Sequence, residues 1–368
     1  MKKTFEFPGF IDVHVHFRDP GVPRAETTAS GLAAAARGGF AAVVTMPNTS
    51  PACDSPDALR YQLERAAEAD AGRRVALFPS ACITKGRAGR EVADLEALAD
   101  AGAALFTDDG SYVADDKVME SAMERAAALG IAVCDHAMDP VALAGGVVRD
   151  CPLARRLGLP VIPVECETKA IRRDIAVCRV TGCRLHIQHI STAEGVELLR
   201  AAQREGLPVS AEATPHHLLF ACEEIPADDA RYKMAPPLGN REDRAELRRA
   251  VKDGVLMFAT DHAPHPAETK SVGFLRSANG IVGLETAIPA TWRAMVEEEG
   301  MDPEAWARAW WDMPRGVLAP ALRERAAALP KTVVEVGEER VVDVAAFASL
   351  SDNCPYGGMS FDCWPVPR

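Results

Sequence analysis

Several features that mark membrane, nucleotide-binding and nucleic-acid-binding proteins are missing from this sequence. No run approaches 18 uncharged apolar residues, so we predict no membrane-spanning helix and no membrane partner. Neither GxGxxG nor GxxxxGK(S/T) occurs, which leaves a dinucleotide or P-loop phosphate site without support. The formal net charge is −12 and no block rich in Lys or Arg interrupts it, so we also expect no nucleic-acid partner.

The sequence also lacks the cysteine spacing of a disulfide framework or a zinc knuckle. Its ten cysteines are scattered, and the pair Cys178 and Cys183 has no second pair to complete a metal site. At the N-terminus, Glu6, Pro8 and Asp12 interrupt any hydrophobic region of a signal peptide. We therefore expect buried, reduced thiols and a cytoplasmic location.

Apolar runs of strand length alternate with amphipathic helical patterns along most of the chain. The strand candidates are residues 10–16, 41–48, 75–84, 103–109, 131–136, 184–190, 208–217 and 255–262. Helical patterns between them cover residues 56–69, 116–130, 192–206 and 241–254. Eight β/α units in about 260 residues have the count and length of a TIM barrel, so we predict an α/β fold, a (β/α)8 TIM barrel. A doubly wound open sheet is the alternative, since periodicity alone cannot close a barrel.

The positions of the histidines favour the closed barrel. All nine lie in the strand candidates or in the loops that follow, most of them toward the C-terminal ends: His14, His16, His136, His186, His189, His216, His217, His262 and His265. The carboxyl ends of the strands form the face on which barrel enzymes build their active sites. Nine histidines on one rim therefore indicate a functional site rather than scattered structural residues.

The spacing of these side chains suggests a metal centre. His14 and His16 stand at i and i+2, so their side chains project from the same side of one strand and can share an ion. His136, His189 and Asp261 follow three other strand candidates. Imidazole and carboxylate groups are the ligands that zinc and related ions prefer.

Two neighbouring ions also need a bridging carboxylate, and the fourth strand candidate ends in FTDDG. This segment offers Asp108 and Asp109, of which only one can face the barrel mouth because adjacent strand residues point to opposite sides. The simpler interpretation of DDG is a turn without a ligand role.

Several motifs of the sequence together resemble those of the dihydroorotases of the amidohydrolase superfamily. The motifs that carry the resemblance, in the family's order, are PGFIDVHVHFRDPG, MPNTSP, FTDDG, HIQHIST, ATPHHL, ATDHAPH and GIVGLET. The resemblance implies a zinc-dependent cyclic amidohydrolase that interconverts L-dihydroorotate and N-carbamoyl-L-aspartate in de novo pyrimidine biosynthesis. It also implies a binuclear zinc centre.

The resemblance further implies a role for each metal ligand. One zinc ion would be held by His14, His16 and Asp261 and the other by His136 and His189, with Asp109 as the bridge. The metals would lower the pKa of a water molecule between them and polarise the ring carbonyl. Asp261 would be the catalytic acid and base, taking the proton of that water and passing it to the departing nitrogen.

Substrate contacts are expected around Arg18, which follows His16 by two residues and has the planar guanidinium suited to a carboxylate. By resemblance, Asn48, His265, Asn279 and Gly280 are further substrate-binding residues.

The segment EATPHH is expected to support the ligands from behind. We predict that Glu212, His216 and His217 orient the metal-binding imidazoles, and that His186 and His262 are supporting or packing residues.

Two departures from the family pattern bear on function. The fourth strand candidate contains no lysine, which favours the dihydroorotase type with an aspartate bridge over relatives that carry a carboxylated lysine. The segment YKMAPPLG has Ala235 where the family commonly has a polar residue that contacts the substrate ring. This second departure weakens the assignment of the substrate.

The ends of the chain predict a reduced appendage. Many relatives pair their two ends into a β-sandwich, whereas here only residues 331–344 look strand-like. We expect the hydrolase barrel to occupy residues 1–315 and a small C-terminal β segment, residues 316–368, to pack beside it.

Two alternative functions remain open. Ala235 makes a cyclic amidohydrolase for another ring, of the hydantoin or dihydropyrimidine type, a second hypothesis. A non-catalytic, dihydroorotase-like scaffold is the third, although a scaffold has no need of the six candidate metal ligands. For partners we expect a small-molecule substrate, together with a homodimer or an association with another enzyme of the pyrimidine pathway.

Overall fold

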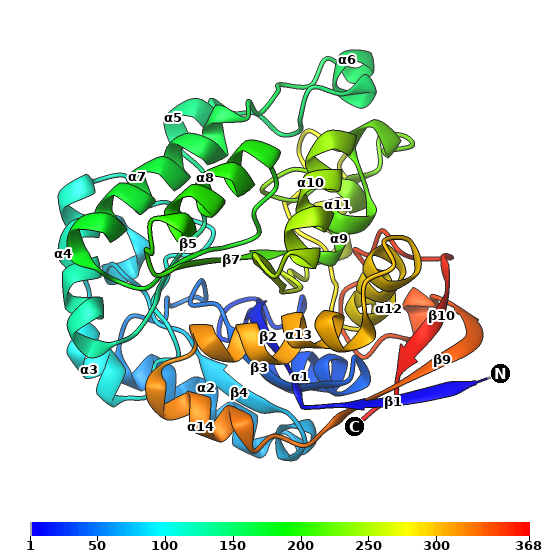
Figure 1. Ribbon diagram of the computed structural model, residues 1–368, viewed down its shortest axis with the longest axis horizontal. Helices are drawn as coiled ribbons and strands as arrows, with labels where there is room; N and C mark the ends of the chain where they lie inside the picture. Colours follow the sequence, from blue (N-terminus) through cyan, green and yellow to red (C-terminus); the bar gives the residue numbers. More distant parts are fainter. Residues whose placement is uncertain (1) are drawn as a thin grey trace.

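The computed structural model describes residues 2–368 and shows parallel strands closed into a barrel and surrounded by helices (Figure 1). The barrel strands are β2 (Phe10–Val15), β3 (Phe40–Thr45), β4 (Ala76–Pro79), β5 (Val133–Asp135), β6 (Leu185–Ile187), β7 (Val209–Ala213) and β8 (Leu256–Phe258). They form two parallel sheets, β2-β3-β4 and β5-β6-β7-β8. Parallel bridges join the two sheets on both sides, through Phe106 on one side and between Val15 and His262 on the other. The closed arrangement confirms the predicted barrel.

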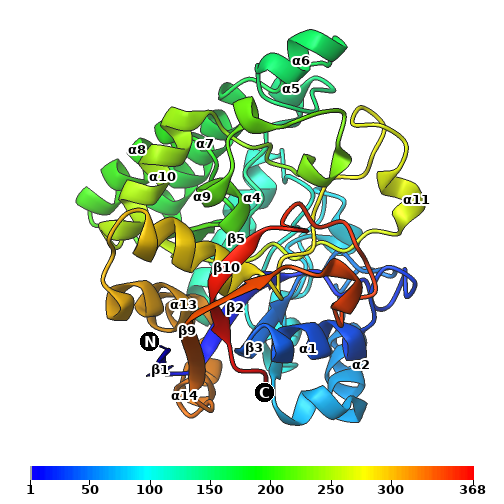
Figure 2. The same ribbon diagram turned by 90° about the vertical axis from the view of Figure 1, so that its right-hand side faces the viewer.

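Helices follow the strands and cover the outside of the barrel (Figures 1 and 2). The larger ones are α1 (Thr28–Arg37), α2 (Pro56–Glu68), α4 (Asp116–Leu129), α7 (Glu165–Thr181), α8 (Ala193–Arg204), α10 (Arg241–Lys252), α13 (Pro303–Val317) and α14 (Pro320–Ala327). Shorter ones are α3 (Leu95–Asp100), α5 (Pro140–Leu143), α6 (Pro152–Leu157), α9 (Pro215–Leu219), α11 (Ala267–Lys270) and α12 (Ala287–Thr291). Among the helices of residues 2–368, none has both the length and the apolar character needed to cross a bilayer.

The fourth predicted strand, residues 103–109, is shorter than expected. Only Phe106 makes strand bridges, although the backbone still bonds on both sides: Phe106 N donates to Ala132 O at 3.0 Å and Thr107 N to Ala81 O at 2.9 Å. Beyond this point the Asp108 carboxylate accepts the backbone N–H groups of Ile83 and Thr84 at 2.9 and 3.1 Å. A side chain thus takes the place of ladder hydrogen bonds, and the strand ends early.

A small antiparallel sheet lies beside the barrel and contains strands from both ends of the chain. Its order is β1 (Lys3–Phe7), β9 (Thr332–Val341) and β10 (Ser360–Pro365), so the two termini lie on the same side of the molecule (Figure 1). Sequence patterns had indicated only the middle strand, because β1 and β10 are short and only partly buried. The division of the chain at residue 315 stays a prediction.

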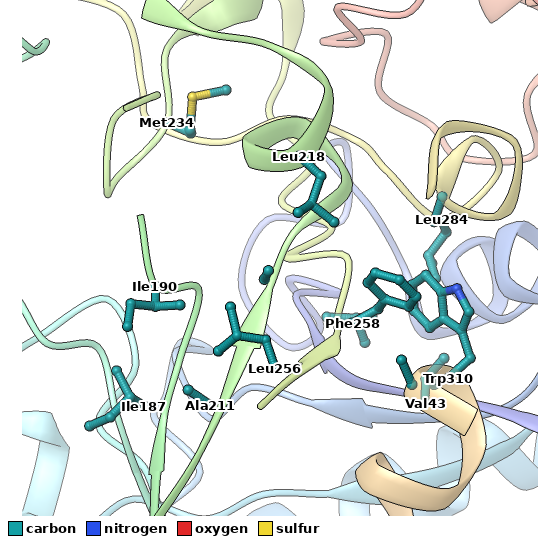
Figure 3. Packing of buried hydrophobic residues seen from close by; sticks show 14 of the residues in the cluster. Val43, Ile187, Ile190, Ala211, Leu218, Met234, Leu256, Phe258, Leu284 and Trp310 are labelled. Atoms are coloured by element: carbon teal, nitrogen blue, oxygen red, sulfur yellow. The ribbon is translucent and has the colours of Figure 1, made fainter. Parts of the chain in front are cut away.

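Aromatic side chains fill the contact between α13 and the strands β2 and β8. Trp310 of α13 is fully buried, with its ring centroid 5.2 Å from that of Phe40 and 5.1 Å from that of Phe258. Trp306, one turn earlier, lies 5.5 Å from Phe10. Figure 3 shows Trp310 beside Phe258 and Val43. This cluster fixes the helix before the appendage onto the barrel.

We predict that Trp310→Ala destabilises the protein by about 3–5 kcal/mol, because a buried indole is lost and its cavity cannot fully collapse. Urea unfolding followed by circular dichroism measures this loss. The matched control is Trp311→Ala, which removes a half-buried indole that stacks on Arg315. Equal destabilisation by the two substitutions would contradict the role assigned to the aromatic cluster.

Candidate metal centre and active site

A cavity of about 440 Å³ opens where the barrel strands end, and predicted site residues surround it. Those that line it are His16, Arg18, Asn48, Asp109, His136, His189, Asp261, His265, Asn279 and Gly280. The remaining predicted ligand, His14, is fully buried beside them and contacts Asp109 and Asp261. The fold therefore brings every predicted ligand and substrate-binding residue to one place, while their individual roles stay predictions.

His14 and His16 face the same pair of carboxylates. Nε2 of His14 lies 3.3 Å from Oδ1 of Asp109 and 3.5 Å from Oδ1 of Asp261. Nε2 of His16 lies 3.0 Å from Oδ1 of Asp261 and 3.4 Å from Oδ2 of Asp109. The two imidazoles of the HxH pair thus meet the carboxylates from β2, as their spacing suggested.

The other two histidines approach the Oδ1 atom of Asp109 that His14 also faces. Nδ1 of His136 lies 3.6 Å and Nε2 of His189 lies 3.8 Å from Oδ1 of Asp109, and these two ring nitrogens are 2.8 Å apart. Asp109 is therefore the carboxylate that all four imidazoles approach. The neighbouring Asp108 points to the backbone of Ile83 and Thr84 instead.

The donor atoms are arranged as a metal ion would require. Ligand atoms lie within 4.8 Å of one another in two groups, one of His14, Asp109 and His189 and the other of His14, His16 and Asp261. Within residues 2–368, Nε2 of His14 and Oδ1 of Asp109 are buried without any hydrogen-bond partner. Buried polar atoms are rarely left unpaired. Imidazole nitrogens and carboxylate oxygens that converge in this way fit zinc or a related cation.

The charge balance of the site favours ionised carboxylates. Burial raises the pKa of Asp109, but the imidazoles of His14 and His16 outweigh burial and hold that pKa well below its usual range. The pKa of Asp261 is lowered in the same way, by His14 and His16 against burial. Burial lowers the pKa of His14, yet Asp109, Glu212 and Asp261 raise it well above its ordinary value. The centre thus concentrates negative charge that attracts cations.

Glu212 of β7 supports the imidazole ligands from below. Nδ1–H of His14 donates to Oε1 at 2.6 Å, the backbone N–H of His189 donates to the same oxygen at 3.2 Å, and Nε2 of His186 lies 2.9 Å from Oε2. Burial raises the pKa of Glu212, but His14 and His186 lower it to about 2. The bond to Nδ1 leaves Nε2 of His14 free to face a metal ion.

His216 and His217, which were expected to orient the metal-binding imidazoles, make other contacts instead. Nδ1 of His217 lies 2.8 Å from Oγ1 of Thr214, and its Nε2–H donates to Pro236 O at 3.2 Å. His216 lies against it, with ring centroids 4.6 Å apart. Within the described residues, neither imidazole hydrogen-bonds to a predicted metal ligand.

Asn48 contacts the centre in a way that sequence reasoning missed. Its Oδ1 lies 2.9 Å from Nδ1 of His16, and its Nδ2 lies 3.4 Å from Oδ2 of Asp109. The carboxamide therefore holds the His16 ring with Nε2 toward the carboxylates. Its expected contact with substrate stays a prediction.

Arg18 and His265 form one wall of the cavity. Nε of Arg18 donates to Pro264 O at 3.3 Å, and Nη2 lies 3.4 Å from Nε2 of His265. Because Nε2 of His265 is 2.6 Å from Asn279 O, that nitrogen carries the proton and donates it to the carbonyl. Burial and then the charge of Arg18 lower the pKa of His265 to about 3, so this imidazole is neutral. Arg18 supplies the positive charge of this wall.

Some of the functional side chains sit on strained backbone. Arg18, His189 and Asp261 have φ angles of 55°, 33° and 48°, in the left-handed region that residues with a Cβ seldom adopt. Such strain persists only where the surroundings over-determine the conformation. No sequence pattern predicts these left-handed backbone conformations.

Asp12 and Arg87 are further supporting residues that the sequence reasoning did not single out. The Asp12 carboxylate accepts the backbone N–H groups of His14 and Thr260 at 3.2 and 3.0 Å, which ties β2 to the segment before Asp261. Nη2 of Arg87 donates to Asp109 O at 2.6 Å. An acid inside the apolar strand FIDVHVH was a usable signal for Asp12, whereas Arg87 ends a short 3-10 helix, Lys85–Arg87, that no sequence pattern indicates.

A (β/α)8 barrel with imidazoles and carboxylates converging at its mouth is the fold and site of metal-dependent amidohydrolases. The family described as Dihydro-orotase-like matches residues 5–195. The dihydroorotase of Geobacillus thermodenitrificans is 42% identical over 363 residues, which cover 98% of this chain and 84% of that protein. The dihydroorotase of Listeria innocua is 41% identical over 370 residues, covering 98% and 84% of the two chains. The chain therefore belongs to the dihydroorotase family, a family of cyclic amidohydrolases.

Solved structures support the fold. The L-hydantoinase (dihydropyrimidinase) of Arthrobacter aurescens superposes with a TM-score of 0.83 at 24% identity, covering 99% of this chain and 83% of that one. The dihydroorotase of Saccharomyces cerevisiae, solved with 5-fluoroorotic acid, gives a TM-score of 0.75 at 16% identity and covers 100% of both chains.

We predict that Glu212→Gln lowers the affinity for zinc by about 10–100-fold, because the neutral amide no longer holds His14 with Nε2 toward the centre. Competition with a chromogenic chelator measures this affinity. Glu205→Gln, an exposed change beside Arg179, is the control and should leave zinc affinity unchanged. Wild-type affinity in the Glu212 variant would show that His14 is oriented by other contacts.

Proposed function

We propose that this protein interconverts L-dihydroorotate and N-carbamoyl-L-aspartate with the help of two zinc ions. The observation that carries the proposal is the convergence of four imidazoles on Asp109 and Asp261 in a cavity that also exposes Arg18. Membership of the dihydroorotase family supports the choice of reaction.

The proposed ligands divide between the ions as the sequence suggested. His14, His16 and Asp261 would hold one ion, His136 and His189 the other, and Asp109 would bridge them. When bound, zinc lowers the pKa of a coordinated water and polarises a carbonyl group. With Asp109 as the bridge, the site would not need a carboxylated lysine.

Asp261 is the proposed proton carrier of the reaction. Its carboxylate is buried and ionised, lies 3.0 Å from Nε2 of His16 and lines the cavity. In ring opening it would accept a proton from the attacking water and deliver it to the departing ring nitrogen; in ring closure it would act in reverse.

Arg18 is the proposed partner of the substrate carboxylate. The chain carries a net charge of −12, so attraction for an acidic substrate must come from the cavity itself. Arg18 lines the cavity, and its Nε–H already bonds to Pro264 O, which leaves the terminal guanidinium nitrogens for the carboxylate. His265, Asn48, Asn279 and Gly280 would complete the contact surface.

Ala235 supports a second candidate, a cyclic amidohydrolase acting on another ring. Its methyl group lines the cavity and packs against the apolar cluster of Met138, Ile162 and Cys166, so this side of the site offers no polar contact. Lys233 cannot replace it, because its Nζ donates to the carbonyls of Leu275 and Ser277. A ring with an apolar substituent would suit this wall.

We also propose that the protein is cytoplasmic and that it associates with a second copy or with another enzyme of the pyrimidine pathway. All ten cysteines are buried and free, which suits a reducing compartment. A non-catalytic scaffold is less consistent with the charged, buried ligand set.

A substrate panel tests the proposed function. We expect the zinc-loaded protein to turn over dihydroorotate in preference to dihydrouracil, hydantoin and allantoin, as measured by absorbance and by chromatography of products. Asp261→Asn should lower the rate by about 10²–10⁴-fold, since the proton carrier is lost. Preference for another ring would support the second candidate. More than about a tenth of the activity in a folded, zinc-loaded Asp261 variant would exclude the assigned role.

We predict that Arg18→Lys raises the KM for dihydroorotate by about tenfold or more, because a single ammonium group cannot replace the planar fork. Zinc content should remain at the wild-type level, since Arg18 contacts no predicted ligand directly. Steady-state kinetics and metal analysis on one preparation test both statements. An unchanged KM would place the carboxylate contact elsewhere.

A further inference from the structure

Asn353 lies in the segment between β9 and β10, far along the chain from the barrel strands, and is 1% exposed. Its carboxamide makes all of its hydrogen bonds to the wall of the cavity. Nδ2 donates to Ala263 O and Gly280 O, both at 3.0 Å, and Oδ1 accepts the backbone N–H of His265 at 3.2 Å. Figure 2 shows the C-terminal segment after β9 reaching the loop that carries α11.

These bonds join the two arms of one loop. Residues 263–265 form the first arm and residues 280–282 the second; Ala263 N also donates to Ile281 O at 2.7 Å and Val282 N to Asn353 O at 3.1 Å. Gly280 allows the close approach, because its φ is +125° and a Cβ would lie 2.6 Å from Cβ of Ala263. Asn353 thus ties the two arms together through its side chain, beside the direct backbone bond between them.

The arms carry the groups proposed to hold the substrate carboxylate. Pro264 O accepts a hydrogen bond from Nε of Arg18, and His265 donates to Asn279 O across the arms. A change in the spacing of the arms would therefore shift the guanidinium, although Asn353 does not line the cavity.

We propose that Asn353 is a positioning residue that sets the orientation of Arg18 by holding Ala263, His265 and Gly280 through its carboxamide. This inference rests on the proposed function. It assigns to the C-terminal appendage a part in substrate binding that neither the barrel nor its metal ligands supply.

The chain offers an informative substitution and a matched control. Asn353→Asp keeps the shape of the side chain but cannot donate to both carbonyls, and as a carboxylate it would repel them. Ser351, two residues earlier and 5% exposed, donates instead to Ala25 O at 2.7 Å, outside the loop. Ser351→Ala therefore removes a buried hydrogen bond from the same segment without touching the arms.

The experiment compares kcat, KM, zinc content and melting temperature of the full-length wild type and these variants. We expect Asn353→Asp to raise the KM for dihydroorotate by about 10–100-fold, with kcat changed less than about threefold and zinc retained. Ser351→Ala should keep the wild-type KM. Combining Asn353→Asp with Arg18→Lys should raise KM no further than the stronger single change, because both act on one contact.

Opposite outcomes overturn the inference. An unchanged KM, an equal effect of Ser351→Ala, or additive effects with Arg18→Lys would each show that Asn353 has only a structural role. If Asn353→Asp fails to fold, the smaller Asn353→Ser is judged by the same criteria. Absence of dihydroorotate turnover in the wild type would instead contradict the proposed function, and this inference with it.

Discussion

Burial of Asp109 and Asp261 at the mouth of an apolar barrel is the constraint on which the rest of the site depends. An ionised carboxylate removed from water costs several kcal/mol unless positive charge and hydrogen-bond donors surround it. Here two imidazoles from the end of β2 lie beside both carboxylates, and two more, after β5 and β6, lie beside Asp109, so the donor set suits a cation. Each imidazole must then be held in one orientation, because a rotated ring would leave a buried charge unpaired.

Glu212 shows how the barrel meets that demand. It is a third buried carboxylate, yet it accepts hydrogen bonds from a side chain of β2, a side chain of β6 and a backbone N–H beyond β6. Strands that lie apart in the barrel are thereby joined through one group. Asp12 does the same between β2 and the segment before Asp261, and the strained φ angle of Asp261 is maintained beside it. The hydrogen bonds of Glu212 and Asp12 therefore both join elements of the barrel and orient side chains of the site.

Apolar contacts connect the barrel to its appendage. Trp306 and Trp310 seal α13 against β2 and β8, and the chain then continues into the sheet formed by β1, β9 and β10. From this sheet the segment around Asn353 returns to the cavity wall. The appendage is therefore connected to the barrel both through α13 and at the cavity wall.

The sequence by itself predicted most elements of the barrel and the residues that gather at its cavity. Periodicity marked most of the strands and helices, and the position of most histidines at or after the ends of strands predicted that they gather on one rim, because parallel strands of a barrel end on the same face. Only the tertiary structure decided those features that depend on contacts between segments distant in the sequence. The amide groups of Ile83 and Thr84 take Asp108 away from the mouth and leave Asp109 in it. β1 and β10 became strands only by pairing with β9, and Arg87 and Asn353 gained their contacts only when loops met. A local sequence pattern reflects only whether a segment is helical or extended. These contacts form between segments that are distant in the sequence, so no local pattern predicts them.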